Sequence, residues 1–190
     1  MAPRSTPKGP SPVGSRVPLP GLEFPTPESS HIVIVGAMGS GKTTLARELA
    51  RALRRPFFDS DQSIRERTGR NGREIAEADG VEVLHRLEAD VLHEALGHST
   101  PVVVAAAASV IEDPAVRDAL DETYCVWVTA DPEILAERST RGDHRRAVGR
   151  TEHLEHRTPL FEQAADLVVD TGDLSEGDSV ERVLAAFRAP

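Results

Sequence analysis

The chain has 190 residues, enough for one domain with a hydrophobic core, and 39% of them are hydrophobic. Its net charge is −9, which disfavours the broad electropositive surface that binds nucleic acid. No apolar run is long enough to cross a bilayer, and the single cysteine, Cys125, allows no internal disulfide and is expected in the core. We expect a cytoplasmic monomer that acts on a small-molecule substrate, with no nucleic-acid or membrane partner.

The first 30 residues differ in composition from the rest of the chain. They contain eight of the fourteen prolines and no apolar block of the kind found in signal peptides. A segment of this composition buries too little apolar surface to fold by itself. We predict a disordered tail at 1–30, a passive extension rather than a docking motif, and one domain at 31–190.

Short apolar runs alternate with helical patterns from residue 31 onward. Five runs rich in β-branched or aromatic residues indicate strands at 31–35, 56–59, 102–104, 124–128 and 167–170. Helices are predicted at about 41–53, at 81–96, after the cap at Asp113, from Asp131 to about Arg138, through about Phe161, and at 178–188. This alternation predicts a three-layer α/β fold with a five-stranded parallel sheet covered on both faces.

The segment between the first strand and the first helix carries the strongest motif. Residues 36–43 match G-x-x-x-x-G-K-[ST] at every fixed position, in the strand–loop–helix context of a phosphate-binding loop. Backbone N–H groups and the helix N-terminus would hold a polyphosphate, the lysine would neutralise its oxygens, and the threonine hydroxyl would face Mg²⁺. The residues expected to contact the nucleotide here are Gly36, Gly39, Ser40, Gly41, Lys42, Thr43 and Thr44.

Several linked motifs after the loop resemble the shikimate kinase family in order and spacing. The resemblance covers nearly all of residues 31–173, and it implies a P-loop kinase with strand order 2-3-1-4-5, ATP and Mg²⁺. The motifs are Phe58–Ile64, Arg67-Thr68-Gly69, Asp79-Gly80, Leu87-Glu88 and His156–Phe161, followed by Asp166.

Two carboxylates follow the second strand. Asp59, at the strand end, would hold Mg²⁺ through water together with Thr43, while Asp61 resembles the family's substrate-binding aspartate and would orient or deprotonate the acceptor hydroxyl. A D-x-D pattern after a strand also caps helices, so the alternative is a pair of solvated caps for a helix that begins near Ser63.

Arginines supply the remaining cations. The resemblance places a mobile lid near 139–150, with Arg138 packing on the nucleotide and Arg145 contacting the transferred phosphate; a solvated basic loop is the alternative. Arg157 resembles the arginine that holds the acceptor's carboxylate, and the alternative for it is a surface ion pair with Glu162.

The acceptor side departs from the family pattern. Three consecutive glycines are replaced by Ala106-Ala107-Ala108, whose Cβ atoms make positive φ costly. His85 stands where an arginine usually holds the carboxylate, and Arg86 would need a shifted register to replace it. Arg65, Arg146 and Phe161 also differ from the residues usual at their positions.

These departures affect the acceptor and leave the ATP side intact. We therefore favour a kinase acting on a polyol or cyclitol-like acid other than shikimate, through Lys42, Asp61 and Arg145, with His85, Ala107 and Arg157 at the acceptor. The alternatives are a genuine shikimate kinase and a nucleotide-binding module with weak catalysis. Gluconate-type and nucleoside monophosphate kinases share the fold and rank lower.

Overall fold

The computed structural model describes residues 30–140 and 150–189, so the predicted tail and most of the predicted lid lie outside the described residues. The strands are β1 (Ile32–Val35), β2 (Phe57–Asp59), β3 (Val103–Ala105), β4 (Tyr124–Thr129) and β5 (Leu167–Asp170). The helices are α1 (Lys42–Leu53), α2 (Ser60–Thr68), α3 (Gly72–Asp79), α4 (Val81–Leu96), the 3₁₀ helix η2 (Ala108–Glu112), α5 (Pro114–Leu120), α6 (Pro132–Thr140), α7 (Arg150–Ala164) and α8 (Glu176–Phe187).

The five strands form one parallel sheet in the order β2-β3-β1-β4-β5, which confirms the predicted fold and strand order. β1 lies at the centre, paired with β3 on one side and β4 on the other. All four of its side chains are fully buried, as expected of a strand covered on both faces. None of the helices in the described ranges combines the length and apolar character that crossing a bilayer requires.

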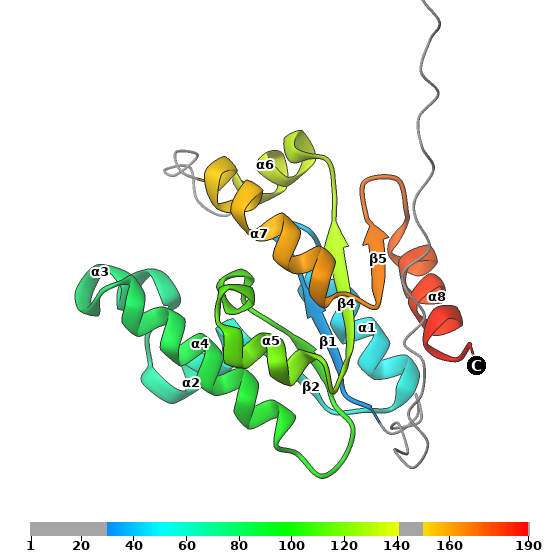
Figure 1. Cartoon of the computed structure of the whole chain (residues 1–190), viewed down its shortest axis with the longest axis horizontal. Coiled ribbons are helices and arrows are strands. Elements are labelled where there is room, and N and C mark those ends of the chain that lie inside the picture. The colour runs from blue at the N-terminus through cyan, green and yellow to red at the C-terminus, as the bar shows by residue number, and fades with distance from the viewer. Residues whose placement is uncertain (1–29, 141–149, 190) are drawn as a thin grey trace, which may run out of the picture.

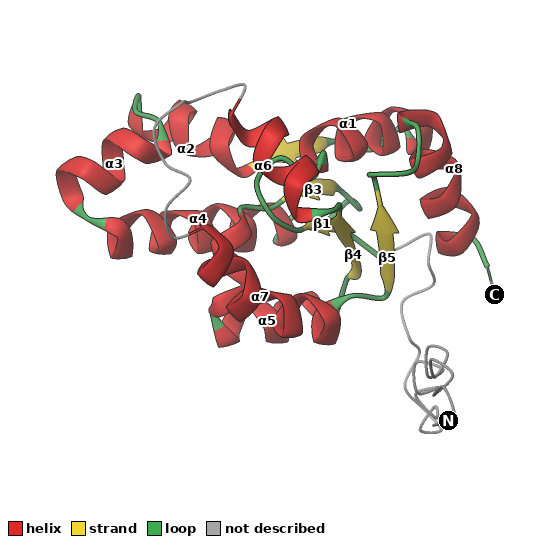
Figure 2. Cartoon of the chain, turned by 90° about the horizontal axis from the view of Figure 1, so that it is seen from above, coloured by secondary structure: helices red, strands yellow, loops and turns green. Residues whose placement is uncertain are grey.

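Alternate residues of β1 point into two separate cores. Val33 and Val35 belong to the core that includes residues of α4, α5 and α7, while Ile32 and Ile34 pack with residues of α1 and α8. Figure 2 shows the sheet between these two helical layers. Each β1 side chain thus packs against one of the two helical layers. This packing holds the strand in place, and with it the loop that follows.

One stacked aromatic pair joins the sheet to α7. Trp127 of β4 lies against Phe161, with ring centroids 5.9 Å apart and planes inclined by 18°. Phe161 is fully buried, so the phenyl ring that replaces the family's usual tyrosine fills core space where a hydroxyl would need a partner. Cys125 is also buried, as predicted, and burial raises the pKa of its thiol.

Several helices differ from their predicted bounds, and the 3₁₀ helix η2 was not predicted. α2 begins at Ser60 instead of near Ser63, because Asp59 itself is the N-cap and accepts from Gln62 N. α8 begins two residues earlier than predicted, where Ser175 caps it. The sequence analysis also missed α3, a helix of eight residues.

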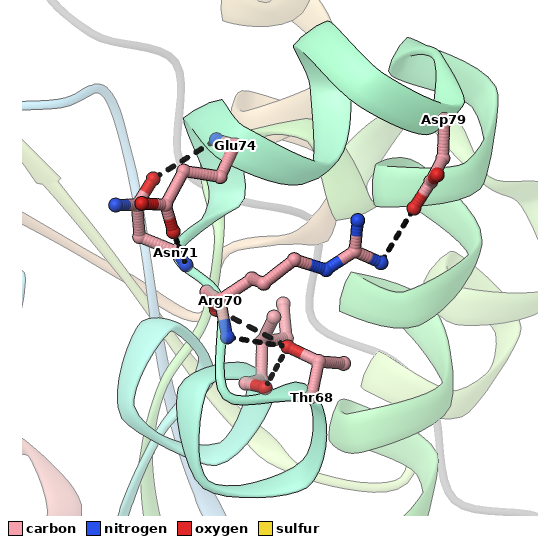
Figure 3. A network of polar contacts seen from close by, with 6 residues as sticks. Thr68, Arg70, Asn71, Glu74 and Asp79 are labelled. Atoms are coloured by element: carbon pink, nitrogen blue, oxygen red, sulfur yellow. Dashed lines mark hydrogen bonds and ion pairs between the residues drawn. The ribbon is translucent and has the colours of Figure 1, made fainter.

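α3 is held by a compact polar network that Figure 3 shows from close by. Asn71 and Glu74 form a capping box, and Arg70 reaches along the helix to Asp79 at 2.6 Å. Thr68, at the end of α2, bonds the backbone on both sides of the turn that precedes α3. Together with a small core of Ile64, Ile75 and Val91, these bonds make α2, α3 and α4 a unit at one side of the sheet (Figure 1).

A partly buried histidine at the other end of the sheet makes stability depend on pH. Val102 N donates to His31 Nδ1 at 3.2 Å, which requires that nitrogen to be unprotonated. Burial lowers the pKa of His31, and the charges of Arg55 and His98 lower it further.

We predict that the free energy of unfolding decreases as the pH falls below 6.5, the ordinary pKa that His31 has in the unfolded chain. The unfolded state then binds a proton that the folded state resists, so this contribution is complete above that pH and is lost on acidification. Urea titrations from pH 8 to pH 5 should show a shallower loss in His31→Asn than in the wild type. The exposed His93→Asn is the control, and an unchanged slope in His31→Asn would contradict the assignment.

Candidate functional site

Two clefts meet at the carboxyl ends of the strands, where open α/β sheets bind ligands. The first, of about 460 Å³, runs from the phosphate loop to η2 and α7. The second, of about 390 Å³, lies between α1 and the segment from β5 to α8. Gly39, Gly41 and Thr44 line both clefts, so the loop forms the wall that they share.

The loop geometry requires glycine at its first position. Gly36 has φ +142°, and a Cβ built there would lie 2.2 Å from the carbonyl oxygen of Val128 on the neighbouring strand. Ser40 is fully buried, and its hydroxyl has no hydrogen-bond partner within the described part of the chain. Gly36 therefore holds the start of the loop against β4, while Gly39 and Gly41 face the clefts.

Lys42 lies within the loop that it is expected to serve. Its Nζ donates to the carbonyl oxygen of Ala37 at 2.8 Å. Burial lowers the pKa of Lys42 to about 8, although the carboxylates of Asp61 and Asp59 oppose this shift. A negatively charged group that enters the loop would stabilise the protonated form of this amine.

Asp59 joins the loop to α2. Thr43 Oγ1 donates to Asp59 Oδ2 at 2.8 Å, while the other carboxylate oxygen accepts from Gln62 N at 3.2 Å as the helix cap. Of the two carboxylates considered as caps, Asp59 is the N-cap and Asp61 lies inside α2, and the cap coexists with the contact to Thr43. A hydroxyl and a carboxylate side by side at a phosphate loop are hard oxygen donors that suit Mg²⁺, so the residues present fit this ion.

Asp61 lies one residue into α2 and lines the first cleft. Burial raises the pKa of its carboxyl group, and the neighbouring Asp59 raises it further, against the opposing charges of Lys42 and Arg65. A carboxylate with a raised pKa is a stronger base than one in water. Asp61 therefore combines a place in the lining of the cleft with a carboxyl group of raised pKa.

The far end of the first cleft is lined by the residues that the sequence placed at the acceptor, namely His85, Ala107 and Arg157. Arg86 is exposed and does not line this cleft, so the one-residue offset on α4 does separate the two side chains. Ala107 has φ −61°, and Arg54 is the only non-glycine residue with positive φ in the described ranges. The three alanines therefore adopt conformations that do not require glycine.

Arg157 makes a different ion pair from the alternative considered above. Its Nη2 donates to Glu112 Oε2 at 2.8 Å across the gap between α7 and η2, and the suggested pairing with Glu162 is wrong. The hydrogen bond from Arg157 lowers the pKa of Glu112, and the charges of Arg157, His85 and His156 add to this effect against the opposing effect of burial. Glu112 consequently stays ionised beside the cleft wall.

Arg138 lies in the second cleft, and Arg145 lies outside the described residues. Arg138 donates to the hydroxyl and the carbonyl oxygen of Thr171, both at 3.1 Å. Thr171 in turn donates to the carbonyl oxygen of Ser40 at 2.9 Å. This chain of contacts connects α6 and the end of β5 to the phosphate loop.

Glu88 is a cleft residue to which the sequence analysis gave no role. It is 8% exposed and accepts a hydrogen bond from the Ser109 hydroxyl. Burial raises the pKa of Glu88 to about 6, against the hydrogen bond from Ser109, and the charge of Asp61 contributes in the same direction as burial. A glutamate between Leu84 and Leu92 on the apolar stripe of a predicted helix is the signal that could have identified it.

Comparisons with known proteins agree with this architecture. A family model described as shikimate kinase matches residues 38–188. The shikimate kinase of Dechloromonas aromatica is 38% identical over 166 residues, covering 83% of this chain and 90% of the relative, and that of Symbiobacterium thermophilum is 35% identical over 164 residues, covering 81% and 94%. The structure of Acinetobacter baumannii shikimate kinase in complex with shikimate matches with a TM-score of 0.75 at 28% identity, covering 82% of this chain and 90% of that one.

The two glycines at the ends of the loop give a matched pair of variants. Gly41 has φ +92°, and a Cβ placed there would meet nothing within 4 Å, whereas Gly36 combines positive φ with the clash against Val128. Gly41→Ala should lose about 1–2 kcal/mol of unfolding free energy through the backbone alone. Gly36→Ala should lose clearly more, because a strand must also move. Urea denaturation of both variants checks this, and equal losses would contradict the close approach to β4.

Proposed function

Because the chain belongs to the shikimate kinase family, we propose that it transfers the γ-phosphate of ATP to a hydroxyl group of shikimate. The family consists of ATP-dependent phosphotransferases that act on a hydroxyl acceptor. Shikimate replaces the acceptor expected from the sequence, a different polyol or cyclitol-like acid, which the departures in the acceptor site had favoured. Two findings support the change: a relative of matching fold is described with shikimate bound, and Ala107 has a backbone conformation that needs no glycine.

One observation carries the proposal. A single cleft is lined by the phosphate loop, by the Arg157 guanidinium and by Asp61, whose charge acts on both Lys42 of the loop and Glu88. A small carboxylic acid with several hydroxyl groups has the charge and the hydrogen-bonding groups to meet these side chains. The loop would hold the donor, Arg157 would hold the acid group, and Asp61 would face the hydroxyl that reacts.

In the proposed reaction the acceptor hydroxyl oxygen attacks the γ-phosphorus. A new oxygen–phosphorus bond forms as the bond between the γ-phosphorus and the bridging oxygen breaks, and ADP leaves with that electron pair. Asp61 orients the hydroxyl and accepts its proton. The raised pKa of Asp61 suits this role, because the proton then moves to a base stronger than an ordinary aspartate.

Cations around the loop would stabilise the charge of the transferring group. Lys42 Nζ, which donates to the carbonyl oxygen of Ala37 in the loop, would donate to phosphate oxygens instead when a nucleotide binds. Mg²⁺ would neutralise the phosphate oxygens, and Thr43 and Asp59 would hold it, directly and through water. Arg145 would approach from the lid, while Arg138 would pack on the nucleotide in the second cleft.

The direct test is a coupled assay of ADP release by the full chain with ATP and Mg²⁺. Shikimate, quinate, gluconate and a panel of cyclitols are compared at equal concentrations. We expect shikimate to be the preferred acceptor by kcat/KM. A higher kcat/KM for any other acid in the panel would refute the proposed acceptor, and no stimulation by any acceptor despite tight ATP binding would favour a non-catalytic module.

Asp61→Asn tests the proposed base. The amide keeps the size of the side chain but cannot accept the proton, so kcat should fall by about 10²–10⁴-fold, the usual contribution of general base catalysis. The Kd for ATP, measured by calorimetry, should stay within about twofold, since Asp61 does not contact the nucleotide in this mechanism. Asp90→Asn, an exposed aspartate of α4, is the control. An equal loss of turnover and ATP affinity would assign Asp61 to the nucleotide instead.

A further inference from the structure

The 3₁₀ helix η2 touches both helices that form the acceptor end of the first cleft. Residues three apart in a 3₁₀ helix lie on the same face, and Ser109 and Glu112 have this spacing. Ser109 donates to Glu88 of α4, and Glu112 accepts from Arg157 of α7. One face of a single turn therefore holds the two opposite charges that line this end of the cleft.

The pair between Glu112 and Arg157 differs from an ordinary surface ion pair. The Arg157 side chain is 15% exposed and that of Glu112 is 28% exposed, whereas the Arg51–Glu48 pair on α1 has exposures of 70% and 40%. Ion pairs as exposed as the latter contribute little, because water screens them and their side chains remain mobile. The less exposed pair between Glu112 and Arg157 can instead hold the long Arg157 side chain in one orientation. The entropy of ordering that side chain is then lost on folding and not when a ligand binds.

Arg157 has no second arginine to share the binding of an acid group in the first cleft, as far as the described residues show. It is the only arginine among the described residues that line the first cleft. His85, at the position where the family pattern has another arginine, cannot form a two-pronged bond to a carboxylate. The orientation of one guanidinium therefore determines how well an acid group is held.

The guanidinium is not fully satisfied by its protein contacts. Its Nε is buried and has no hydrogen-bond partner in the part of the chain that the structure describes, while Nη2 is committed to Glu112. A guanidinium carries five N–H donors in a rigid plane, so a hydrogen bond at one nitrogen, together with the buried side chain behind it, restricts the directions of the others. The contact with Glu112 thus restricts where the remaining donors point.

We propose that Glu112 is a positioning residue for the acceptor, which orients the Arg157 guanidinium so that its other donors meet the acceptor's carboxylate. This inference rests on the proposed function, because it takes an anionic acceptor. Glu112 does not itself line the cleft, and it acts only through Arg157. The effect should consequently fall on the binding of the acid, with little change in the chemical step or in the binding of ATP.

Glu112→Ala and Glu112→Gln test this in steady-state assays of the full chain with shikimate. Glu112→Ala should raise KM for shikimate about tenfold, because a misdirected guanidinium loses a charged hydrogen bond to the acid group. Glu112→Gln should raise it less, about threefold, because the amide oxygen still accepts from the guanidinium but lacks the charge of the carboxylate. In both variants kcat and KM for ATP should stay within about twofold. KM for the methyl ester of shikimate, which lacks the carboxylate, should not change.

A double-mutant cycle separates positioning from a structural role. In an Arg157→Ala background, Glu112→Ala should cause no further rise in KM for shikimate, because the group through which it acts is absent. Glu162→Ala, which removes an exposed glutamate on the same helix as Arg157, is the control and should leave KM unchanged.

The possible outcomes are distinct. An unchanged KM in Glu112→Gln and Glu112→Ala, or an equal rise in KM with and without Arg157, would overturn the positioning role. If Glu112→Ala does not fold, the near-isosteric Glu112→Gln and the methyl ester decide the question. Wild-type protein that releases no ADP with shikimate would refute the proposed function itself, which is seen before any variant is measured.

Discussion

The complete burial of β1 between two helical layers determines where everything else in the active site lies. Each β1 side chain packs into one of two cores, and each edge of the strand pairs with a parallel neighbour, so the strand has no freedom to shift. The phosphate loop starts where this pairing ends, with Gly36 pressed against the Val128 carbonyl group. The same sheet edge presents Asp59 and the three alanines, since the ends of neighbouring parallel strands lie together.

Removal of water has opposite effects on the two signs of charge in the first cleft. It lowers the pKa of Lys42 and raises those of Asp61 and Glu88, so each group is held in a state that an incoming partner of opposite charge would relieve. A triphosphate would stabilise the charged form of Lys42, and Asp61 would take up the proton of a hydroxyl group. In the proposed function, the substrates would bring these opposite charges with them.

The sequence predicted most of what depends on local patterns and little of what depends on distant contacts. The strands and the phosphate loop follow from short runs and fixed spacings, and the family resemblance supplied the strand order. α3 was missed although Asn71 and Glu74 form a capping box, because the helix that follows is short. The partner of Arg157 lies 45 residues away, so no spacing rule could have chosen Glu112 over the nearer Glu162. The position of Glu88 on an apolar helix stripe marked it as unusual, but its partner Ser109 lies 21 residues away and could not be chosen from the sequence.

The stacking of Trp127 on Phe161 has a practical consequence. Trp127 is the only tryptophan of the chain, and Phe161 follows Arg157 by four residues, which places both on the same side of α7. Indole emission depends on the rings that lie against it, so the fluorescence of Trp127 reports how α7 packs on the sheet, with no label required.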